Sequence, residues 1–311
     1  MIRKIFSLLL LSGLIYSLAA CSAAPTSSRQ SAGQGSTQSD TFQASSQEAS
    51  VDERLEQFED MPIDPPYNFN PNDMMPEDFG PYFEAEYYGN EVSTYPILEG
   101  TDYENTVTVL KSEQEGPTIY VIAGVHGDEQ AAWHTGNLLK KIDIKAGTLY
   151  ILSPANPWGA QADPPSRYVV AKEDLNRCFP GDPNGTPAQQ VAAAIMQDVT
   201  RAAPDFVFDL HEAKVVNSQL DFLGSTLIFT DLTGMEEMFM NLVLETEAGT
   251  LCSEPFAYQG PGPEGSVNRT ITETLHIPVI TVETFRRYEM ERRISDQLAV
   301  TQYVLAYYGL V

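Results

Sequence analysis

The sequence has little positive charge. Lysine and arginine together number 18, against 43 aspartates and glutamates, so the 311 residues carry a formal net charge of -25. Binding to phosphate backbones or anionic headgroups through charge requires clustered positive side chains. We therefore expect no nucleic-acid partner.

Cysteine is also scarce, with only Cys21, Cys178 and Cys252 in the whole chain. Three cysteines exclude a small scaffold built on disulfides. Cys178 and Cys252 could pair in an oxidising compartment or remain thiols, and their number alone does not decide between these states. The sequence does not reveal the oligomeric state.

Long apolar runs are missing, apart from one at residues 5–18 that follows Arg3 and Lys4. This run is shorter than the roughly 20 residues of a membrane-spanning helix. Its positive start and small-residue end are typical of a secretory signal at residues 1–20. Residues 18–21, Leu-Ala-Ala-Cys, resemble the bacterial lipobox, in which the cysteine is acylated. We expect an extracytoplasmic protein held to the membrane by a lipid on Cys21; an ordinary signal peptide is the alternative.

Three further segments follow this signal. Residues 21–60 are rich in Ser, Gln and Ala and are expected to form a flexible tether, because they have too little apolar surface to offset the entropy of ordering. Residues 61–90 are acidic and rich in Pro and Tyr, and their aromatic side chains predict an arm packed on the domain. Residues 91–311 suffice for one catalytic domain.

Apolar patterning in this domain alternates between short strands and longer helices. The predicted strands are at residues 107–110, 118–123, 148–152, 206–210, 227–229 and 278–282. The predicted helices are at residues 130–142, 187–200, 235–248 and 266–275, with a further helix at the C-terminus. This order predicts an α/β fold with a mostly parallel or mixed sheet and helices on both faces.

Polar residues that can bind metal follow three of these strands. They are His126 and Glu129 after 118–123, His211 after 206–210, and Glu283 after 278–282. Ligands bind outside the carboxyl ends of the strands in such sheets, so we expect the four side chains to converge.

Two histidines and one glutamate leave a zinc ion with an open fourth position for water. Such a metal-activated water needs a neighbouring base, for which Glu283 is the candidate. In the alternative reading the three are ordinary polar residues of turns, and Glu283 pairs with Arg286 or Arg287.

Four motifs in this order resemble the succinylglutamate desuccinylase/aspartoacylase family, a branch of the zinc carboxypeptidase superfamily. They are Gly-Val-His-Gly-Asp-Glu at 124–129, Asp-Leu-Asn-Arg at 174–177, Asp-Leu-His at 209–211 and Thr-Val-Glu-Thr at 281–284. The resemblance covers residues 92–311 and implies one Zn2+ per chain. It implies these roles: His126, Glu129 and His211 as zinc ligands, Glu283 as general base and acid, Arg167 polarising the scissile carbonyl, and Asn176 with Arg177 gripping the substrate carboxylate.

For some of these roles the sequence offers an alternative interpretation. Arg177 could instead pair with Asp174, and Arg201 or Arg269 could take the place of Arg167. His134 and His276 are not expected to bind metal, because the ligand set is complete without them.

The substrate implied is a small carboxylate, and the reaction is amide cleavage of the N-acyl amino acid deacylase type. Family members carry a β-rich domain after the catalytic glutamate, whereas only residues 284–311 follow Glu283 here. We therefore expect a more open site, with residues 258–265 at its rim. A metallocarboxypeptidase that trims peptides or cell-wall stem peptides is the alternative, and a solute-binding lipoprotein without activity is a third reading.

Overall fold

The computed structural model describes residues 61–79, 88–214 and 224–311. The predicted signal peptide, Cys21 and the predicted tether lie outside these residues. Within them, no helix combines the length and the apolar character needed to cross a membrane.

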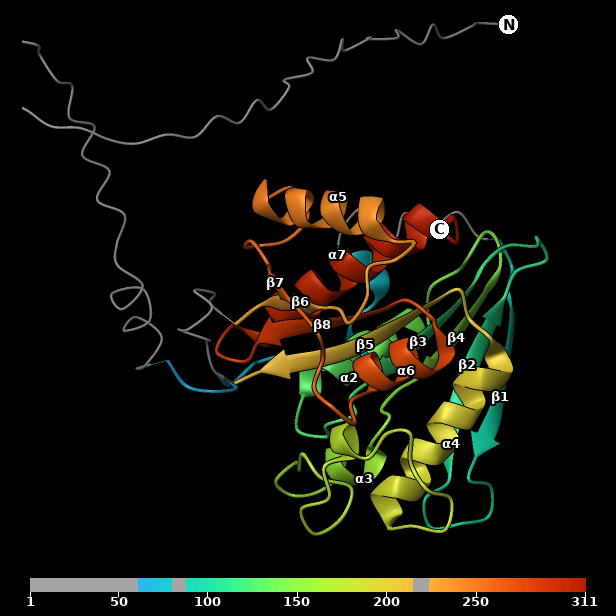
Figure 1. Ribbon diagram of the computed structural model, residues 1–311. Helices are drawn as coiled ribbons and strands as arrows, with labels where there is room; N and C mark the ends of the chain where they lie inside the picture. The colour runs from blue at the N-terminus through green and yellow to red at the C-terminus, as the bar shows by residue number, and fades with distance from the viewer. Residues whose placement is uncertain (1–60, 80–87, 215–223) are drawn as a thin grey trace, which may run out of the picture. The chain divides into compact units, whose positions relative to one another are not determined.

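Eight strands form one mixed sheet in the order β1-β2-β4-β3-β5-β8-β6-β7 (Figure 1). The strands are β1 (Glu91–Ile97), β2 (Asn105–Lys111), β3 (Thr118–Ala123), β4 (Thr148–Leu152), β5 (Phe206–Ala213), β6 (Thr226–Ile228), β7 (Ala257–Gln259) and β8 (Val279–Phe285). The central strands β4, β3, β5 and β8 run parallel, while β1, β2 and β6 join the sheet through antiparallel pairs.

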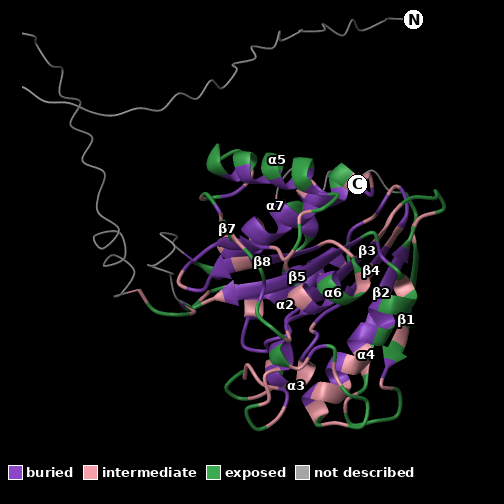
Figure 2. Ribbon diagram, viewed as in Figure 1, coloured by how far each residue is buried: buried purple, intermediate pink, exposed green. Residues whose placement is uncertain are grey.

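Six α-helices of the described residues cover the sheet on both faces. They are α2 (Gln130–Leu139), α3 (Pro157–Ala160), α4 (Pro187–Ala202), α5 (Glu236–Glu247), α6 (Val267–Leu275) and α7 (Met290–Tyr308). Buried side chains of α2, α5 and α7 share one core cluster with the sheet, and those of α4 and α6 share the other. Figure 2 shows the central strands as a buried layer between these helices. The predicted α/β fold with helices on both faces is confirmed.

The strand β3 shows why these sequences form central strands. Its residues Ile119 and Val121 pack into one core cluster, whereas Tyr120 and Ile122 pack into the other. A strand buried on both faces has to be apolar throughout, which is why it reads as a continuous hydrophobic run.

The structure corrects several predicted boundaries. The helix predicted at 130–142 ends at Leu139, because the next amides turn back to nearer carbonyls, with Lys141 N–H donating to Leu138 O at 2.8 Å. The strands β5 and β8 extend beyond their apolar runs. His211 and Glu283 therefore lie within these strands, as directly paired neighbours.

The arm segment at residues 61–79 contacts the domain. Tyr67, Phe69, Met74 and Phe79 pack against the core cluster that contains α2 and α7. The hydroxyl of Tyr67 also donates to Oε1 of Gln130, at 3.2 Å.

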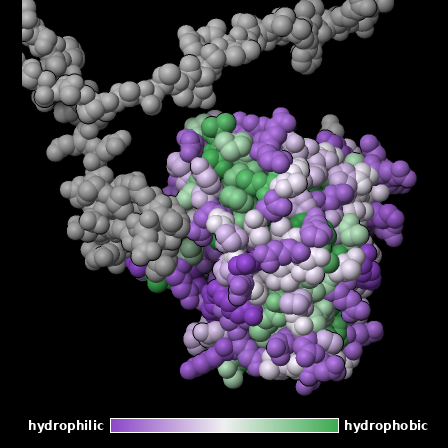
Figure 3. Space-filling view, in the orientation of Figure 1, coloured by the Kyte–Doolittle hydropathy of each residue, from purple (hydrophilic) through white to green (hydrophobic). Residues whose placement is uncertain are grey.

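Apolar surface gathers at the far end of the sheet, around α5 and β7. The helix α5 buries Phe239 and Leu242 but leaves Met240 and Leu244 more than half exposed, and Tyr258 of β7 is exposed beside them. Figure 3 shows this hydrophobic patch over α5.

The turn between β3 and α2 is tightly confined. Gly124 has a φ of 72°, which side chains other than glycine rarely adopt. A Cβ atom at Gly127 would lie 2.2 Å from Ala160 N and from Gly159 C. The turn thus requires a residue without a side chain between His126 and Asp128.

We expect Gly127→Ala to lower the free energy of unfolding by about 3 kcal/mol, the upper end for overpacking, because backbone atoms have to move. Gly249→Ala is the control: Gly249 has a φ of 66°, and a Cβ atom added there would meet no other atom within 4 Å. The control should lose only the left-handed backbone cost of about 1 kcal/mol. Urea denaturation measures both, and equal losses would contradict the steric argument.

Candidate metal centre

Three buried side chains meet at the carboxyl edge of the sheet. His126 and Glu129 come from the β3–α2 turn, His211 comes from β5, and all three are at most 3% exposed. Nδ1 of His126 lies 2.7 Å from Oε1 of Glu129, and Nδ1 of His211 lies 2.8 Å from Oε2 of the same carboxylate. The two Nδ1 atoms are 3.2 Å apart. One ligand atom from each residue can therefore face a common point.

Two carboxylates hold the outer nitrogens of the histidine rings. Oδ1 of Asp174 lies 3.1 Å from Nε2 of His126, and Oδ1 of Asp209 lies 2.8 Å from Nε2 of His211. A carboxylate on one ring nitrogen keeps the proton there and leaves the lone pair on the other nitrogen. Both Nδ1 atoms are thus prepared to bind a metal.

The charges around this point favour a cation. Burial lowers the pKa of His211, but the Asp209 and Glu129 carboxylates outweigh it and raise that pKa well above its ordinary value. Burial raises the pKa of Glu129, but His126 and His211 outweigh it and hold that pKa well below its ordinary value. Positive charge is therefore stabilised between these side chains, as a metal-binding site requires.

Glu283 lies beside this cluster on β8, where it pairs in register with His211. Burial raises the pKa of Glu283 to about 7, with His211 opposing this shift and Glu129 adding to it. A carboxyl group with a pKa in this range can both accept and donate a proton near neutral pH.

Arg167 reaches the cluster from the loop before Asp174. Its Nε lies 3.0 Å from Oδ2 of Asp174, and its Nη1 lies 3.5 Å from Oε1 of Glu129. The competing arginines are used elsewhere: Arg201 pairs with Asp198, and Arg269 pairs with Glu273.

Asn176 and Arg177 occupy the 3₁₀ turn Leu175–Arg177, and they differ in exposure. The buried Asn176 places Nδ2 3.4 Å from Nε2 of His211, while its Oδ1 accepts from Val267 N–H at 2.9 Å. The exposed Arg177 donates through Nη1 to the carbonyl of Asn176, at 2.6 Å. Asp174 contacts His126 and Arg167, so its carboxylate is already occupied by other partners than Arg177, which was its alternative partner in the sequence.

A cavity of about 250 Å³ contains these groups and extends to the rim. It is lined by His126, Glu129, Arg167, Asn176, Arg177, Asp209, Glu212, Ala213, Lys214, Ile228, Gly262, Pro263, Ser266, Asn268, Thr281 and Glu283. Gly262 and Pro263 belong to the loop predicted to form the rim. The cavity is therefore lined by every predicted site residue of the domain except His211, which is buried beside it on β5.

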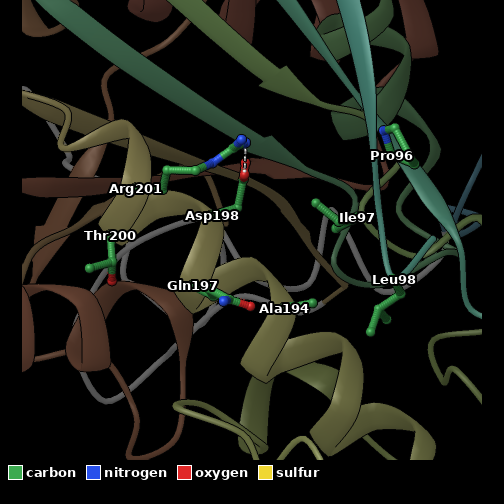
Figure 4. Close-up of a pocket in the computed structure, with 8 residues that line it drawn as sticks. All are labelled: Pro96, Ile97, Leu98, Ala194, Gln197, Asp198, Thr200 and Arg201. Carbon is green, nitrogen blue, oxygen red and sulfur yellow. Dashed lines mark hydrogen bonds and ion pairs between the residues drawn. The ribbon is translucent and has the colours of Figure 1, made fainter.

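A larger groove of about 730 Å³ lies elsewhere, between the end of β1 and helix α4 (Figure 4). Its buried Asp198 accepts from the hydroxyls of Tyr95 at 2.8 Å and Tyr120 at 2.7 Å and pairs with Arg201. This carboxylate is thus fully occupied in holding β1, β3 and α4 together, and the groove offers no comparable chemistry.

The remaining sequence candidates stay outside the metal cluster. His134 is buried and packs on Trp133, with ring centroids 3.8 Å apart. His276 ends α6 with a φ of 56°. Cys178 and Cys252 are both free thiols, so they do not form the disulfide considered above. The alternative partner of Glu283, Arg286, instead contacts Asp64 and Asp128.

Comparison with known proteins links this geometry to a family. Residues 115–254 match the family model described as the succinylglutamate desuccinylase/aspartoacylase catalytic domain. This match contains the three clustered side chains and Arg167, Asn176 and Arg177, whereas Glu283 lies beyond it.

The chain is also similar to N-alpha-acetyl-L-2,4-diaminobutyric acid deacetylase of Halomonas elongata, with 30% identity over 129 residues. The aligned part is 39% of this chain and 36% of the deacetylase, so the chain spans about a third of that relative's length.

Solved structures share the fold. An aspartoacylase family protein from Mesorhizobium loti has a TM-score of 0.54 at 20% identity, covering 73% of this chain and 69% of that chain. A metallo-carboxypeptidase from Burkholderia cenocepacia has a TM-score of 0.52 at 15% identity, covering 70% of this chain and 64% of that chain. The resemblance to the succinylglutamate desuccinylase/aspartoacylase family predicted from the sequence motifs is confirmed by the match of residues 115–254 to that family's catalytic domain.

Proposed function

We propose that the protein is a zinc-dependent hydrolase that cleaves an amide bond of a carboxylate-bearing substrate, in the manner of an N-acyl amino acid deacylase. The observation that carries this proposal is the convergence of His126, Glu129 and His211 beside Glu283 on the neighbouring strand. Similarity to a deacetylase of an N-acetylated amino acid supports this substrate class.

The donor set fits zinc. Two nitrogens that are each about 2.0–2.1 Å from one tetrahedral zinc ion lie roughly 3.3–3.4 Å apart, and the Nδ1 atoms of His126 and His211 are 3.2 Å apart. Two histidines and one glutamate are a known ligand set of catalytic zinc. Bound there, zinc would supply Lewis acidity that activates water and polarises the substrate carbonyl.

Glu283 moves the protons of the reaction. Its carboxylate takes a proton from the attacking water as the new C–O bond forms at the carbonyl carbon. The same carboxyl group then donates that proton to the leaving nitrogen as the C–N bond breaks, which yields a carboxylic acid and an amine; transfer of the acid's remaining proton to the amine gives a carboxylate and an ammonium ion. A pKa of about 7 suits both halves of this task.

Two arginines and an asparagine account for the remaining requirements. Arg167 places its guanidinium beside Glu129, where it can stabilise negative charge that develops on the scissile carbonyl oxygen. Arg177 is exposed at the cavity, and its planar guanidinium suits a bidentate contact with a substrate carboxylate. Asn176 supports this contact from the same turn.

The cavity favours a small substrate over a peptide. Its volume of about 250 Å³ is below the roughly 300–1,000 Å³ typical of pockets for drug-sized ligands. A metallocarboxypeptidase remains the competing function, so release of amino acid from N-acyl amino acids should be compared with C-terminal trimming of peptides. Activity confined to peptides would overturn the deacylase assignment.

We further propose that the protein is an extracytoplasmic bacterial lipoprotein, bound to the membrane through Cys21. The support is the sequence alone: Arg3 and Lys4, the apolar run at 5–18 and the small residues before Cys21.

We predict that Glu283→Gln lowers kcat for amide hydrolysis by about 10²–10⁴-fold, the usual contribution of a general base. Its zinc content should equal that of the wild type, because all three ligands remain. Rate measurements and metal analysis of the same samples test this. Glu273→Gln, on the exposed side of α6, is the control and should keep both values. A wild-type rate in Glu283→Gln would exclude the proposed base.

We predict that Arg177→Gln lowers kcat/KM for a carboxylate substrate by roughly 10–100-fold, as expected from losing hydrogen bonds worth about 1.5–3 kcal/mol to a charged group. The same substrate with its carboxylate converted to a neutral amide is the control. If Arg177 reads the carboxylate, that analogue should be hydrolysed equally by variant and wild type. A loss of similar size on both substrates would mean that Arg177 has another role.

We predict that Cys21→Ser abolishes labelling of the protein by radioactive palmitate in a bacterial host, because the acylated thiol is absent. Cys178→Ser should keep the label, since its thiol lies in the folded domain. Persistent labelling of Cys21→Ser would contradict the proposed anchor.

A further inference from the structure

The arm contributes a carboxylate that lies between two buried arginines. Oδ1 of Asp64 accepts from Nε of Arg286 at 3.0 Å and from Nη1 of Arg293 at 3.1 Å, and Oδ2 accepts from Nη2 of Arg286. The backbone N–H of Asp64 donates to the carbonyl of Arg286, at 2.8 Å. In Figure 1 the blue segment that contains Asp64 passes the carboxyl ends of β5 and β8.

Arg286 connects Asp64 to the first metal-binding turn. Its Nη1 donates to Oδ2 of Asp128 at 2.9 Å, and Asp128 directly precedes Glu129 in the chain. Arg286 is 4% exposed, so water cannot readily replace either contact. The position of the guanidinium therefore depends on both carboxylates.

Arg293 connects Asp64 to the second metal-binding element. Its Nη1 donates to Oε1 of Glu212 at 2.5 Å, and Glu212 directly follows His211. Among the residues that the structure describes, Nε and Nη2 of Arg293 have no hydrogen-bond partner, so Nη1 alone carries its contacts with Asp64 and Glu212.

Glu212 in turn contacts Glu129 and the start of α2. Its backbone N–H donates to Oε2 of Glu129 at 3.0 Å, and its Oε2 accepts from the N–H of Ala131 at 2.9 Å. The side chain held by Arg293 thus fixes the start of α2, and its own amide holds the Glu129 carboxylate against β5.

We propose that Asp64 is a positioning residue for the metal centre, and that the arm is a working part of the catalytic unit. This inference rests on the zinc function proposed above. Asp64 fixes Arg286 and Arg293, and these arginines fix Asp128 and Glu212, the chain neighbours of the ligands Glu129 and His211.

The physical reason is the cost of buried charge. Each guanidinium requires anionic partners because it is out of contact with water. When Asp64 loses its charge, both arginines have to find compensation from Asp128 and Glu212, and they shift toward these acids. Such a shift moves the ligand-bearing turn and strand relative to each other. Partners outside the ligand shell commonly change metal affinity by about 10–100-fold.

The backbone at Asp64 is consistent with a constrained position. Its φ is 53°, a left-handed conformation that aspartate and asparagine tolerate better than most residues. Asp64→Asn therefore keeps the backbone and the shape of the side chain and removes only the charge. If Asp64 only attached the arm to the domain, Asp64→Asn would lower the stability of the protein but leave its zinc affinity unchanged.

The test is zinc affinity, measured by competition with a chelator, in full-length wild type, Asp64→Asn and Asp73→Asn. Circular dichroism first establishes that each metal-free protein is folded. We expect Asp64→Asn to bind zinc at least about 10-fold more weakly, the lower end for such partners. The control Asp73 is an exposed acid on the same arm, and Asp73→Asn should match the wild type.

Arg286→Lys serves as the second variant if Asp64→Asn does not fold. Lysine keeps a positive charge near Asp128 but cannot hold Asp64 with two nitrogens, so the same loss of affinity is expected. Zinc affinity within twofold of the wild type, in whichever of the two variants folds, would overturn the inference. If the wild type itself binds no zinc, the proposed function fails instead.

Discussion

Glu129 carries a carboxylate that is almost fully buried and is shared by two imidazole rings and a backbone amide. Burying a charge is costly unless opposite charge and hydrogen-bond donors surround it. The position of Glu129 at the end of a glycine-containing turn gives it no freedom to reach solvent. The groups that contact this carboxylate therefore have to supply positive charge or hydrogen-bond donors, and a metal ion held jointly with His126 and His211 would do so with the fewest groups.

The surrounding charges form alternating layers that extend from this carboxylate. Asp174 and Asp209 balance the histidine rings, and Arg167 balances Asp174 and Glu129 together. On the opposite side, Arg286 and Arg293 face the acids that flank the ligands in the chain. The charges of each layer are balanced by opposite charges in the next. The cluster therefore depends on residues from the arm, from the parallel strands β5 and β8, and from the C-terminal helix α7. Because each buried charge has a partner of opposite sign, these charged side chains can lie in the interior of the domain.

The sequence predicted the parts of this arrangement that follow from short-range pattern. The strands β3, β4 and β5 are buried on both faces, so their apolar runs were visible, and the polar residues beyond them pointed to one edge. The strand β1 was missed because it lies at the edge of the sheet. Its residues 91–94 are exposed, and a single apolar side chain among polar ones gives no apolar run. The extension of β8 through Glu283 was missed for a related reason: its last residues serve the site and break the apolar run.

The role of Asp64 had no local signal, because its arginine partners are 222 and 229 positions away and ion pairs leave no periodicity in the sequence.

These long-range contacts also define what the catalytic unit is. The family match ends at residue 254, whereas the proposed base on β8, Arg286 and Arg293 come later in the chain, and Asp64 comes well before the match begins. The matched segment holds the three candidate metal ligands, but by itself it lacks Glu283, the proposed base, and the two arginines proposed to keep Glu129 in place. In the proposed function, the segments outside the match thus supply the groups that a metal-binding sheet edge needs for hydrolysis.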